Sequence, residues 1–301
     1  MARRAVVLGG VALASISLYA TTKGPDAGGY SATDTAVYSY VDVAGSNGGV
    51  SVLQGVDDGV TALTLPFAFP FYGTQYTTAC VSTNGALYLV PSASACTGLE
   101  DFAPLDLSAV APQGDLAGIF PLWSDLTFQV PGSGAIYYKA VGTAPTRRFV
   151  IQWKSAFPQN STNGFDFEAV LFEGSGKVLF QYQRVDFGSG NPASKGAEAT
   201  IGIRAPGGLA SSKQIVWSVG APVVSDASLV QFTTTAIRIT GDVDGDGSVT
   251  CSDMQVVKAS FGKSATQQGF DPRADVNGDR LVNVLDLSIV SRGLPAGSKC
   301  P

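Results

Sequence analysis

Histidine is absent from this chain of 301 residues. Its absence excludes Ser-His-Asp and Cys-His nucleophile systems, zinc sites that need imidazole, and acid–base catalysis by histidine. Charged residues are also sparse, at 14% of the sequence, and the net charge of −5 leaves no basic stripe. Because nucleic-acid binding depends on clustered lysine and arginine, we expect no nucleic-acid partner.

Long hydrophobic runs are also missing, except at the N-terminus. There, two arginines precede an uncharged run, Ala5 to Ala20, and a polar segment follows. This pattern is typical of a secretory signal peptide, predicted at residues 1–20, and places the protein outside the cell or on its surface. We expect cleavage after Ala20, with cleavage after Ala14 or a retained anchor as alternatives. No later segment approaches the length of a membrane-spanning helix, so we expect no membrane span after cleavage.

Two acidic stretches near the C-terminus share one spacing. Their sequences are Asp242-Val-Asp244-Gly-Asp246-Gly-Ser248-Val-Thr250-Cys-Ser-Asp253 and Asp275-Val-Asn277-Gly-Asp279-Arg-Leu281-Val-Asn283-Val-Leu-Asp286. Each places side-chain oxygens at positions 1, 3, 5 and 12 of a twelve-residue loop, the ligand spacing of an EF-hand calcium loop. The second stretch starts 275 − 242 = 33 residues after the first, and an apolar helix is predicted after each.

The spacing predicts two Ca2+ ions, because a hard cation needs about six or more oxygen ligands and position 7 adds its backbone carbonyl. The predicted ligands of the first ion are Asp242, Asp244, Asp246, the Ser248 carbonyl and Asp253. Those of the second are Asp275, Asn277, Asp279, the Leu281 carbonyl and Asp286, with Thr250 and Asn283 acting through water. The alternative is a pair of turns with solvated carboxylates. That alternative does not predict the matching Val249 and Val282, which we expect to pair across the loops.

The segment from about Gly241 to the C-terminus resembles a type I dockerin domain. Dockerins have Asp at position 12, as both stretches do, and lack the helix that precedes an ordinary EF-hand loop. The resemblance implies a small all-α module at residues 240–301 that docks, with calcium, onto a cohesin-like or other extracellular protein. Position 6 of the second loop is Arg280, where glycine adopts the left-handed conformation at little cost, so we expect the second site to be weaker.

In dockerins, positions 10 and 11 often carry cohesin recognition. Here these positions are Cys251-Ser252 in the first repeat and Val284-Leu285 in the second. The two faces are not equivalent, which argues against docking in two symmetric orientations. An interpretation in which the tail docks nothing, and is a calcium-dependent stability module, also stays open.

Four cysteines allow three disulfide pairings and suit an oxidising compartment. Cys80 and Cys96 lie on either side of the predicted strand Gly85–Val90, within one domain. Because dockerin termini lie close together, the resemblance favours Cys251–Cys300 as the second bond. A metal–thiolate site is the alternative, but the chain lacks a CxxC spacing.

Residues 30–239 predict a mainly β domain, a β-sandwich or jelly-roll. Val, Thr, Phe, Tyr and Gly are frequent, turn signals recur about every 8–15 residues, and Phe165, Phe167, Ala169 and Leu171 alternate with Asp166 and Glu168. The predicted strands are Ala36–Val43, Gly59–Leu65, Tyr76–Ser82, Gly85–Val90, Ala135–Ala140, Arg148–Ser155, Phe165–Phe172, Lys177–Arg184, Ala199–Arg204, Gln214–Val219 and Ser228–Ile239.

Three blocks of this domain resemble bacterial nidogen-like extracellular β domains: Leu65–Gly73, Val81–Leu87 and Gly118–Asp125. The resemblance implies an adhesion or matrix-type surface protein and transfers no catalytic residues. Asn84-Gly85 predicts a tight hairpin turn. We expect the aromatic side chains Phe67, Phe69, Phe71 and Tyr72 to pack in the core or at an edge rather than to form a sugar platform.

The expected function is that of a secreted, non-catalytic, calcium-binding surface protein. The alternative is a dockerin-bearing carbohydrate-binding module or glycoside hydrolase, with a glycan as partner. A hydrolase needs two carboxylates about 5–10 Å apart across a cleft. The candidates are Asp125, Asp166, Glu168 and Glu173, but the Glu-x-Asp-x-x-Glu strand of jelly-roll glucanases is missing, and solvent-facing acids on an outer strand explain the Asp166/Glu168 pair.

Overall fold

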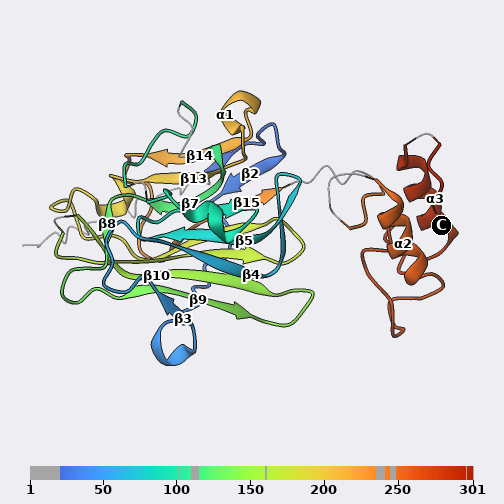
Figure 1. Ribbon diagram of the computed structural model, residues 1–301, viewed down its shortest axis with the longest axis horizontal. Helices are drawn as coiled ribbons and strands as arrows, with labels where there is room; N and C mark the ends of the chain where they lie inside the picture. Colours follow the sequence, from blue (N-terminus) through green and yellow to red (C-terminus); the bar gives the residue numbers. More distant parts are fainter. Residues whose placement is uncertain are drawn as a thin grey trace, which may run out of the picture.

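The computed structural model describes residues 21–100, 102–109, 115–159, 161–234, 241–244, 249–295 and 297–300. The predicted signal peptide at residues 1–20 therefore lies outside the described part. Figure 1 shows a large β body and a small helical tail at the C-terminal end. None of the helices in the described residues is long and apolar enough to cross a membrane.

The β body consists of two antiparallel sheets. In spatial order, the larger sheet contains β1 (Thr22–Lys23), β2 (Tyr30–Thr33), β15 (Ser228–Thr234), β12 (Val178–Arg184), β11 (Phe165–Phe172), β10 (Arg148–Pro158), β9 (Ala135–Val141) and β3 (Val50–Val52), and β8 (Leu126–Thr127) pairs with β10. The smaller sheet contains β14 (Gln214–Val219), β13 (Thr200–Arg204), β7 (Ala117–Trp123), β6 (Leu87–Val90), β5 (Thr74–Ser82) and β4 (Val60–Phe71). The predicted mainly β fold is confirmed.

The core lies between the two sheets. On β11, Phe165, Phe167, Ala169 and Leu171 all point into it, as their alternation predicts. Two hydrogen bonds connect the sheets through this core: Trp153 Nε1 donates to the Ser82 carbonyl (2.9 Å) and the Tyr182 hydroxyl donates to the Pro121 carbonyl (2.7 Å). Both donor groups therefore have a hydrogen-bond acceptor in a place that water cannot reach. The two large aromatic side chains are thus buried without leaving an unsatisfied donor.

The aromatic run on β4 packs as expected. Phe67, Phe69 and Phe71 are buried in the core, and Tyr72 packs against it from the adjoining turn. The Asn84-Gly85 turn between β5 and β6 also forms, with Gly85 in the left-handed region (φ 72°) and its N–H donating to the Ser82 carbonyl. A side chain at Gly85 would collide with the Leu122 carbonyl, so this turn requires glycine.

The outer face of the larger sheet is covered by residues 36–43, and here the predicted strand is wrong. This segment has no regular secondary structure and joins no sheet. Alternate backbone N–H groups, those of Ser39, Val41 and Val43, donate instead to side chains on three neighbouring strands. The acceptors are Gln181 on β12, Glu168 on β11 and Gln152 on β10, which lie opposite one another in the sheet register.

The same covering corrects the expectation that Asp166 and Glu168 face solvent. Both are buried, at 5% and 0% exposure. Asp166 forms ion pairs with Lys154 and Arg184 at the sheet surface, while Glu168 lies beneath the covering segment.

An irregular segment also covers the smaller sheet. The Cys80–Cys96 disulfide attaches the short 3-10 helix η2 (Ala93–Cys96) to strand β5. Leu107 packs there against Phe120 and Trp123 in a second buried cluster. Other short helices occur in connections: η1 (Gly45–Asn47), η4 (Ser194–Gly196) and α1 (Gly208–Ser211).

The tail contains two helices, α2 (Cys251–Ala259) and α3 (Val284–Gly293). Its core consists of Val243, Val249, Met254, Val257, Ala274, Val282 and Val290. The second disulfide joins Cys251, at the start of α2, to Cys300. The sequence therefore paired all four cysteines correctly, and no cysteine is free.

Candidate metal centre

The two tail helices begin in the same way. Thr250 caps α2 by accepting a hydrogen bond from the Ser252 N–H, and Asn283 caps α3 by accepting one from the Leu285 N–H. In both cases the aspartate at position 12 of the loop is the third helical residue, and its side chain accepts a hydrogen bond from the backbone N–H of the cap residue. This capping box places a carboxylate of fixed orientation at the loop closure.

Position 12 is buried in both repeats, and its backbone partners match. Asp253 Oδ1 accepts from the N–H groups of Val243 (2.6 Å) and Asp244 (2.9 Å), and its Oδ2 accepts from Thr250 N–H (2.8 Å). Asp286 makes the equivalent bonds in the second repeat, with the N–H groups of Val276, Asn277 and Asn283. The duplication seen in the sequence is thus a duplication in structure.

In the first loop the carboxylates converge. Asp242, Asp244 and Asp253 each present an oxygen, and these atoms lie within 4.8 Å of one another. Two oxygens on opposite sides of a calcium ion are about 4.6–5.2 Å apart, because each Ca–O distance is about 2.3–2.6 Å. The arrangement therefore fits a hard cation. The other two predicted ligands, Asp246 and Ser248, lie outside the described residues.

The second loop is closed by its own hydrogen bonds. Asp275 accepts from the backbone N–H groups of Asp279 and Arg280, and Asp279 accepts from the Asn277 amide. Its three described carboxylates, those of Asp275, Asp279 and Asp286, do not gather within the distance found in the first loop. Arg280 adopts a φ of 70°, a left-handed conformation that costs a residue with a side chain about 1 kcal/mol or more.

Val249 and Val282 do not pair through their backbones. Val282 exchanges hydrogen bonds with the segment after α2: its carbonyl accepts from Gly262 and its N–H donates to Lys263. Both valines instead share the apolar core of the tail, where Val249 also contacts the backbone of Gly293. The two loops therefore meet at these positions through side-chain packing in a shared apolar core.

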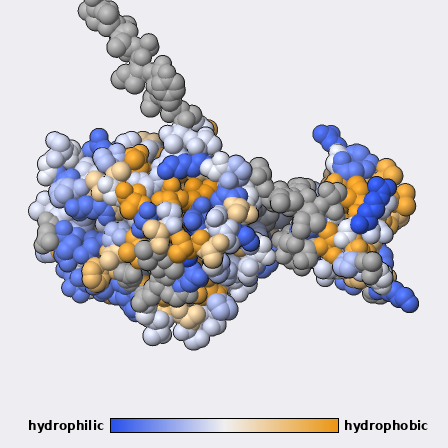
Figure 2. All heavy atoms as spheres, turned by 90° about the horizontal axis from the view of Figure 1, so that it is seen from above, coloured by the Kyte–Doolittle hydropathy of each residue, from blue (hydrophilic) through white to orange (hydrophobic). Residues whose placement is uncertain are grey.

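The tail leaves large apolar side chains in contact with solvent, and hydrophobic surface is visible on it in Figure 2. The exposed residues are Phe261 (48%), Leu281 (42%), Val284 (66%) and Leu285 (55%). The last two stand at positions 10 and 11 of the second repeat. The matching residues of the first repeat offer a disulfide-bonded Cys251 and an exposed Ser252.

The carboxylates considered for hydrolysis are engaged elsewhere, apart from Asp125. Burial raises the pKa of Glu168 to about 8, against the smaller opposing effects of hydrogen bonds from Val41 and Gln181. Glu173 forms a two-point ion pair with Arg147, which lowers its pKa. Asp125 lies on a connection between the sheets, and burial followed by the charges of Asp58 and Asp57 raises its pKa.

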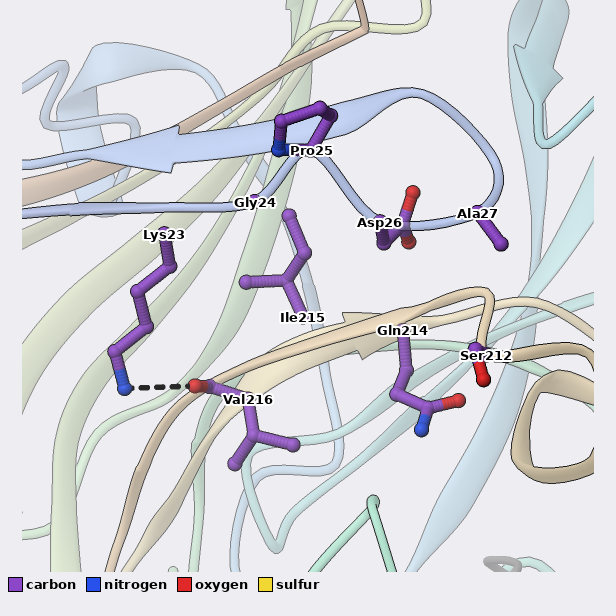
Figure 3. Close-up of a pocket in the computed structure, with 9 residues that line it drawn as sticks. All are labelled: Lys23, Gly24, Pro25, Asp26, Ala27, Ser212, Gln214, Ile215 and Val216. Atoms are coloured by element: carbon purple, nitrogen blue, oxygen red, sulfur yellow. Dashed lines mark hydrogen bonds between the residues drawn. The ribbon is translucent and has the colours of Figure 1, made fainter.

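A shallow pocket lies between the loop that joins β1 to β2 and strand β14 (Figure 3). Its two charged side chains serve the fold. Lys23 donates to the carbonyls of Val216 and Trp217, and Asp26 accepts from two N–H groups and from the Tyr72 hydroxyl. The pocket therefore gathers no catalytic constellation.

Comparison with known protein families gives two matches. A NIDO-related model matches residues 29–243, and a dockerin type I domain model matches residues 240–294. No curated protein and no solved structure matched the chain. The dockerin match agrees with the capped, duplicated loops, and it supports calcium-dependent docking to cohesin-type partners. The NIDO-related match covers the β-sandwich and more than half of the chain. The chain therefore belongs to the NIDO-related family and carries a type I dockerin domain in its C-terminal part.

Proposed function

We propose that this protein is a secreted, non-catalytic surface or matrix protein of adhesion type that its tail attaches to a cohesin-type domain when two Ca2+ ions are bound. The observation that carries the proposal is the asymmetry of the two repeats. Both have the buried aspartate and the capped helix, but only the second exposes apolar side chains at positions 10 and 11. The docking surface is therefore the start of α3.

Calcium supports docking by fixing the position of that helix. The loop aspartates bring negative charge together, and a bound cation removes their repulsion. Because helices of nine or ten residues are marginal on their own, the ions and the helix caps together determine whether α3 is held in place. The ligands are those predicted from the sequence, with the first site the stronger.

The first repeat does not provide an equivalent docking surface. Cys251 is committed to the bond with Cys300, which closes the chain end onto the start of α2. We therefore expect docking in one orientation, through Val284 and Leu285, at an interface whose centre is apolar.

The test is binding of the full chain to a panel of purified cohesin domains in calcium and in EDTA. Val284→Asp with Leu285→Asp should weaken calcium-dependent binding about 30-fold or more, because an apolar anchor is replaced by a charge. Ser252→Asp, at the matching exposed position of the first repeat, is the control and should change affinity less than about threefold. Equal losses from both would contradict docking through the second repeat.

The non-catalytic part of the proposal rests on the carboxylates of the sandwich. Asp166 and Glu173 are held by arginine and lysine side chains, and Glu168 is covered by residues 36–43. Measurable hydrolysis of a polysaccharide by the full chain would contradict it. Secretion is tested separately: the mature protein from the culture medium should begin at Thr21.

A further inference from the structure

The sandwich contains a second cluster of acidic residues, outside the tail. Asp57, Asp58 and Asp125 each present an oxygen, and these atoms lie within 4.8 Å of one another. The first two lie in the connection from β3 to β4, and the third lies between β7 and β8. β3 and β8 belong to the larger sheet and β4 and β7 to the smaller, so both connections cross from one sheet to the other.

The loops around this cluster are held by a buried asparagine. The Asn84 amide donates to Asp58 Oδ1 (2.9 Å) and to the Glu100 carbonyl (3.2 Å), and its oxygen accepts from Leu126 N–H (2.8 Å). Asn84 is completely buried, and its backbone carbonyl also accepts from Ser124 N–H. Asn84 thus holds the two connections that carry the carboxylates in fixed positions. The positions of the three carboxylates are therefore set by the fold.

The cluster lacks the partner that its charge requires. Asp57 Oδ1 is enclosed by protein atoms and accepts no hydrogen bond. Across the part of the chain that the structure describes, none of the three carboxylates forms an ion pair. An enclosed carboxylate oxygen that accepts no hydrogen bond has lost its water ligands without gaining a protein donor, which destabilises the folded state. The two neighbouring negative charges add electrostatic repulsion.

We propose that Asp57, Asp58 and Asp125 form a calcium site of the sandwich, independent of the tail. The donors are all carboxylate oxygens, which suit a hard cation, and no histidine or thiol is present to favour a transition metal. Asp57 is half-buried and has one enclosed oxygen, while exposed Asp58 leaves an entry from solvent and room for water ligands. Because the two connections join opposite sheets, the ion ties the sheets together at this end of the sandwich.

The position of the tryptophans allows a direct test. Residues 241–300 contain no tryptophan or tyrosine, whereas all three tryptophans, Trp123, Trp153 and Trp217, lie in the sandwich. Trp123 is two residues from Asp125 in the sequence. Terbium luminescence excited through tryptophan therefore reports a site in the sandwich. The background is the full chain with Asp253→Asn and Asp286→Asn, which disable the tail loops.

In this background we expect saturable terbium luminescence that calcium displaces. Asp57→Asn with Asp125→Asn should reduce terbium affinity at least tenfold, whereas Asp106→Asn, an exposed acid in another loop, should leave it unchanged. Calcium should also raise the melting temperature of the sandwich in the background protein and not in the double variant. Unchanged luminescence in the double variant, or no calcium effect on melting, overturns the site.

A second variant covers the case in which the double variant fails to fold. Asp58 is exposed and adopts a φ of 47°, a conformation that asparagine tolerates, and an asparagine oxygen still accepts from Asn84. Asp58→Asn should therefore fold and bind terbium at least threefold more weakly. Unchanged affinity in Asp58→Asn contradicts the proposal as well.

Discussion

The sandwich buries a continuous apolar cluster drawn from both of its sheets, whereas the apolar core of the tail contains seven buried side chains among the described residues. The tail also encloses the carboxylates of Asp253 and Asp286, both fully buried. A module of about 60 residues with so small a core is marginal without staples. One chain therefore uses two means of stabilisation: apolar burial in the sandwich, and helix caps, a disulfide and the proposed cations in the tail.

The largest expected effect concerns position 12 of the first repeat. Asp253→Ala removes the acceptor of three backbone N–H groups and one of the proposed ligands. We expect calcium-dependent folding of the tail to be lost, while the sandwich keeps its own melting transition. Asp286→Ala is the matched variant and should lose less, because the second loop is already closed by hydrogen bonds that the backbone N–H groups of Asp279 and Leu281 donate to the carboxylates of Asp275 and Asp279. An equal loss of the helix signal in calcium titrations of the two variants would contradict this ranking of the two sites.

The disulfides give the next effect. Cys251–Cys300 spans 49 residues and Cys80–Cys96 spans 16, which by loop entropy correspond to about 4 and about 3 kcal/mol. Replacing Cys251 and Cys300 by serine should leave the tail unfolded, so that its melting transition disappears. Replacing Cys80 and Cys96 by serine should lower the melting temperature of the sandwich by several degrees without unfolding it, because the large core remains. Calorimetry of the two variants measures both transitions. A sandwich that is destabilised more by loss of its disulfide than the tail is by loss of its own would contradict this prediction.

The third effect is a pH dependence confined to the sandwich. Burial raises the pKa of Glu168 to about 8, above its usual 4.5. The neutral carboxyl is therefore favoured by folding: its contribution is complete below about pH 4.5 and is lost as the pH rises through 8. Glu168→Gln should remove this dependence and make the sandwich more stable than the natural protein, by about 3 kcal/mol at pH 7, with no difference at pH 4.

Glu173→Gln is the control with the opposite sign. Arg147 lowers the pKa of Glu173, so its contribution is present above its usual pKa and is lost as the pH falls. Chemical unfolding of both variants across this pH range separates the two groups. A natural protein whose sandwich is as stable at pH 8 as at pH 5 would show that Glu168 ionises without cost.

Local patterns explain which strands could be predicted. Phe165–Phe172 and Gln214–Val219 have the predicted bounds, because alternating or β-branched residues specify a half-buried strand locally. Strand β2 was missed, because in the described part of the chain it pairs with the two-residue strand β1 and with β15, which follows about 200 residues later. Residues 36–43 alternate like a strand, but their N–H groups reach side chains instead of another backbone. Such long-range partners are not encoded in any local window.

The same distinction applies to the sites. The tail loops were predictable because all their oxygens lie within twelve residues at fixed spacing. The Asp57, Asp58 and Asp125 cluster was not, because only the tertiary fold brings the two connections together. Two faint signals existed: an aspartate pair directly before Gly59, and a single aspartate shortly after Trp123. Neither has the spacing of a ligand loop.

We expect calcium to determine the fold of the tail but not that of the sandwich core. Amide hydrogen exchange of the full chain, in calcium and in EDTA, tests it most directly. We expect the amides of Val243, Thr250, Val276 and Asn283 to lose protection in EDTA, while those of strands β10 to β12 keep theirs. Tail amides equally protected in both conditions would contradict it.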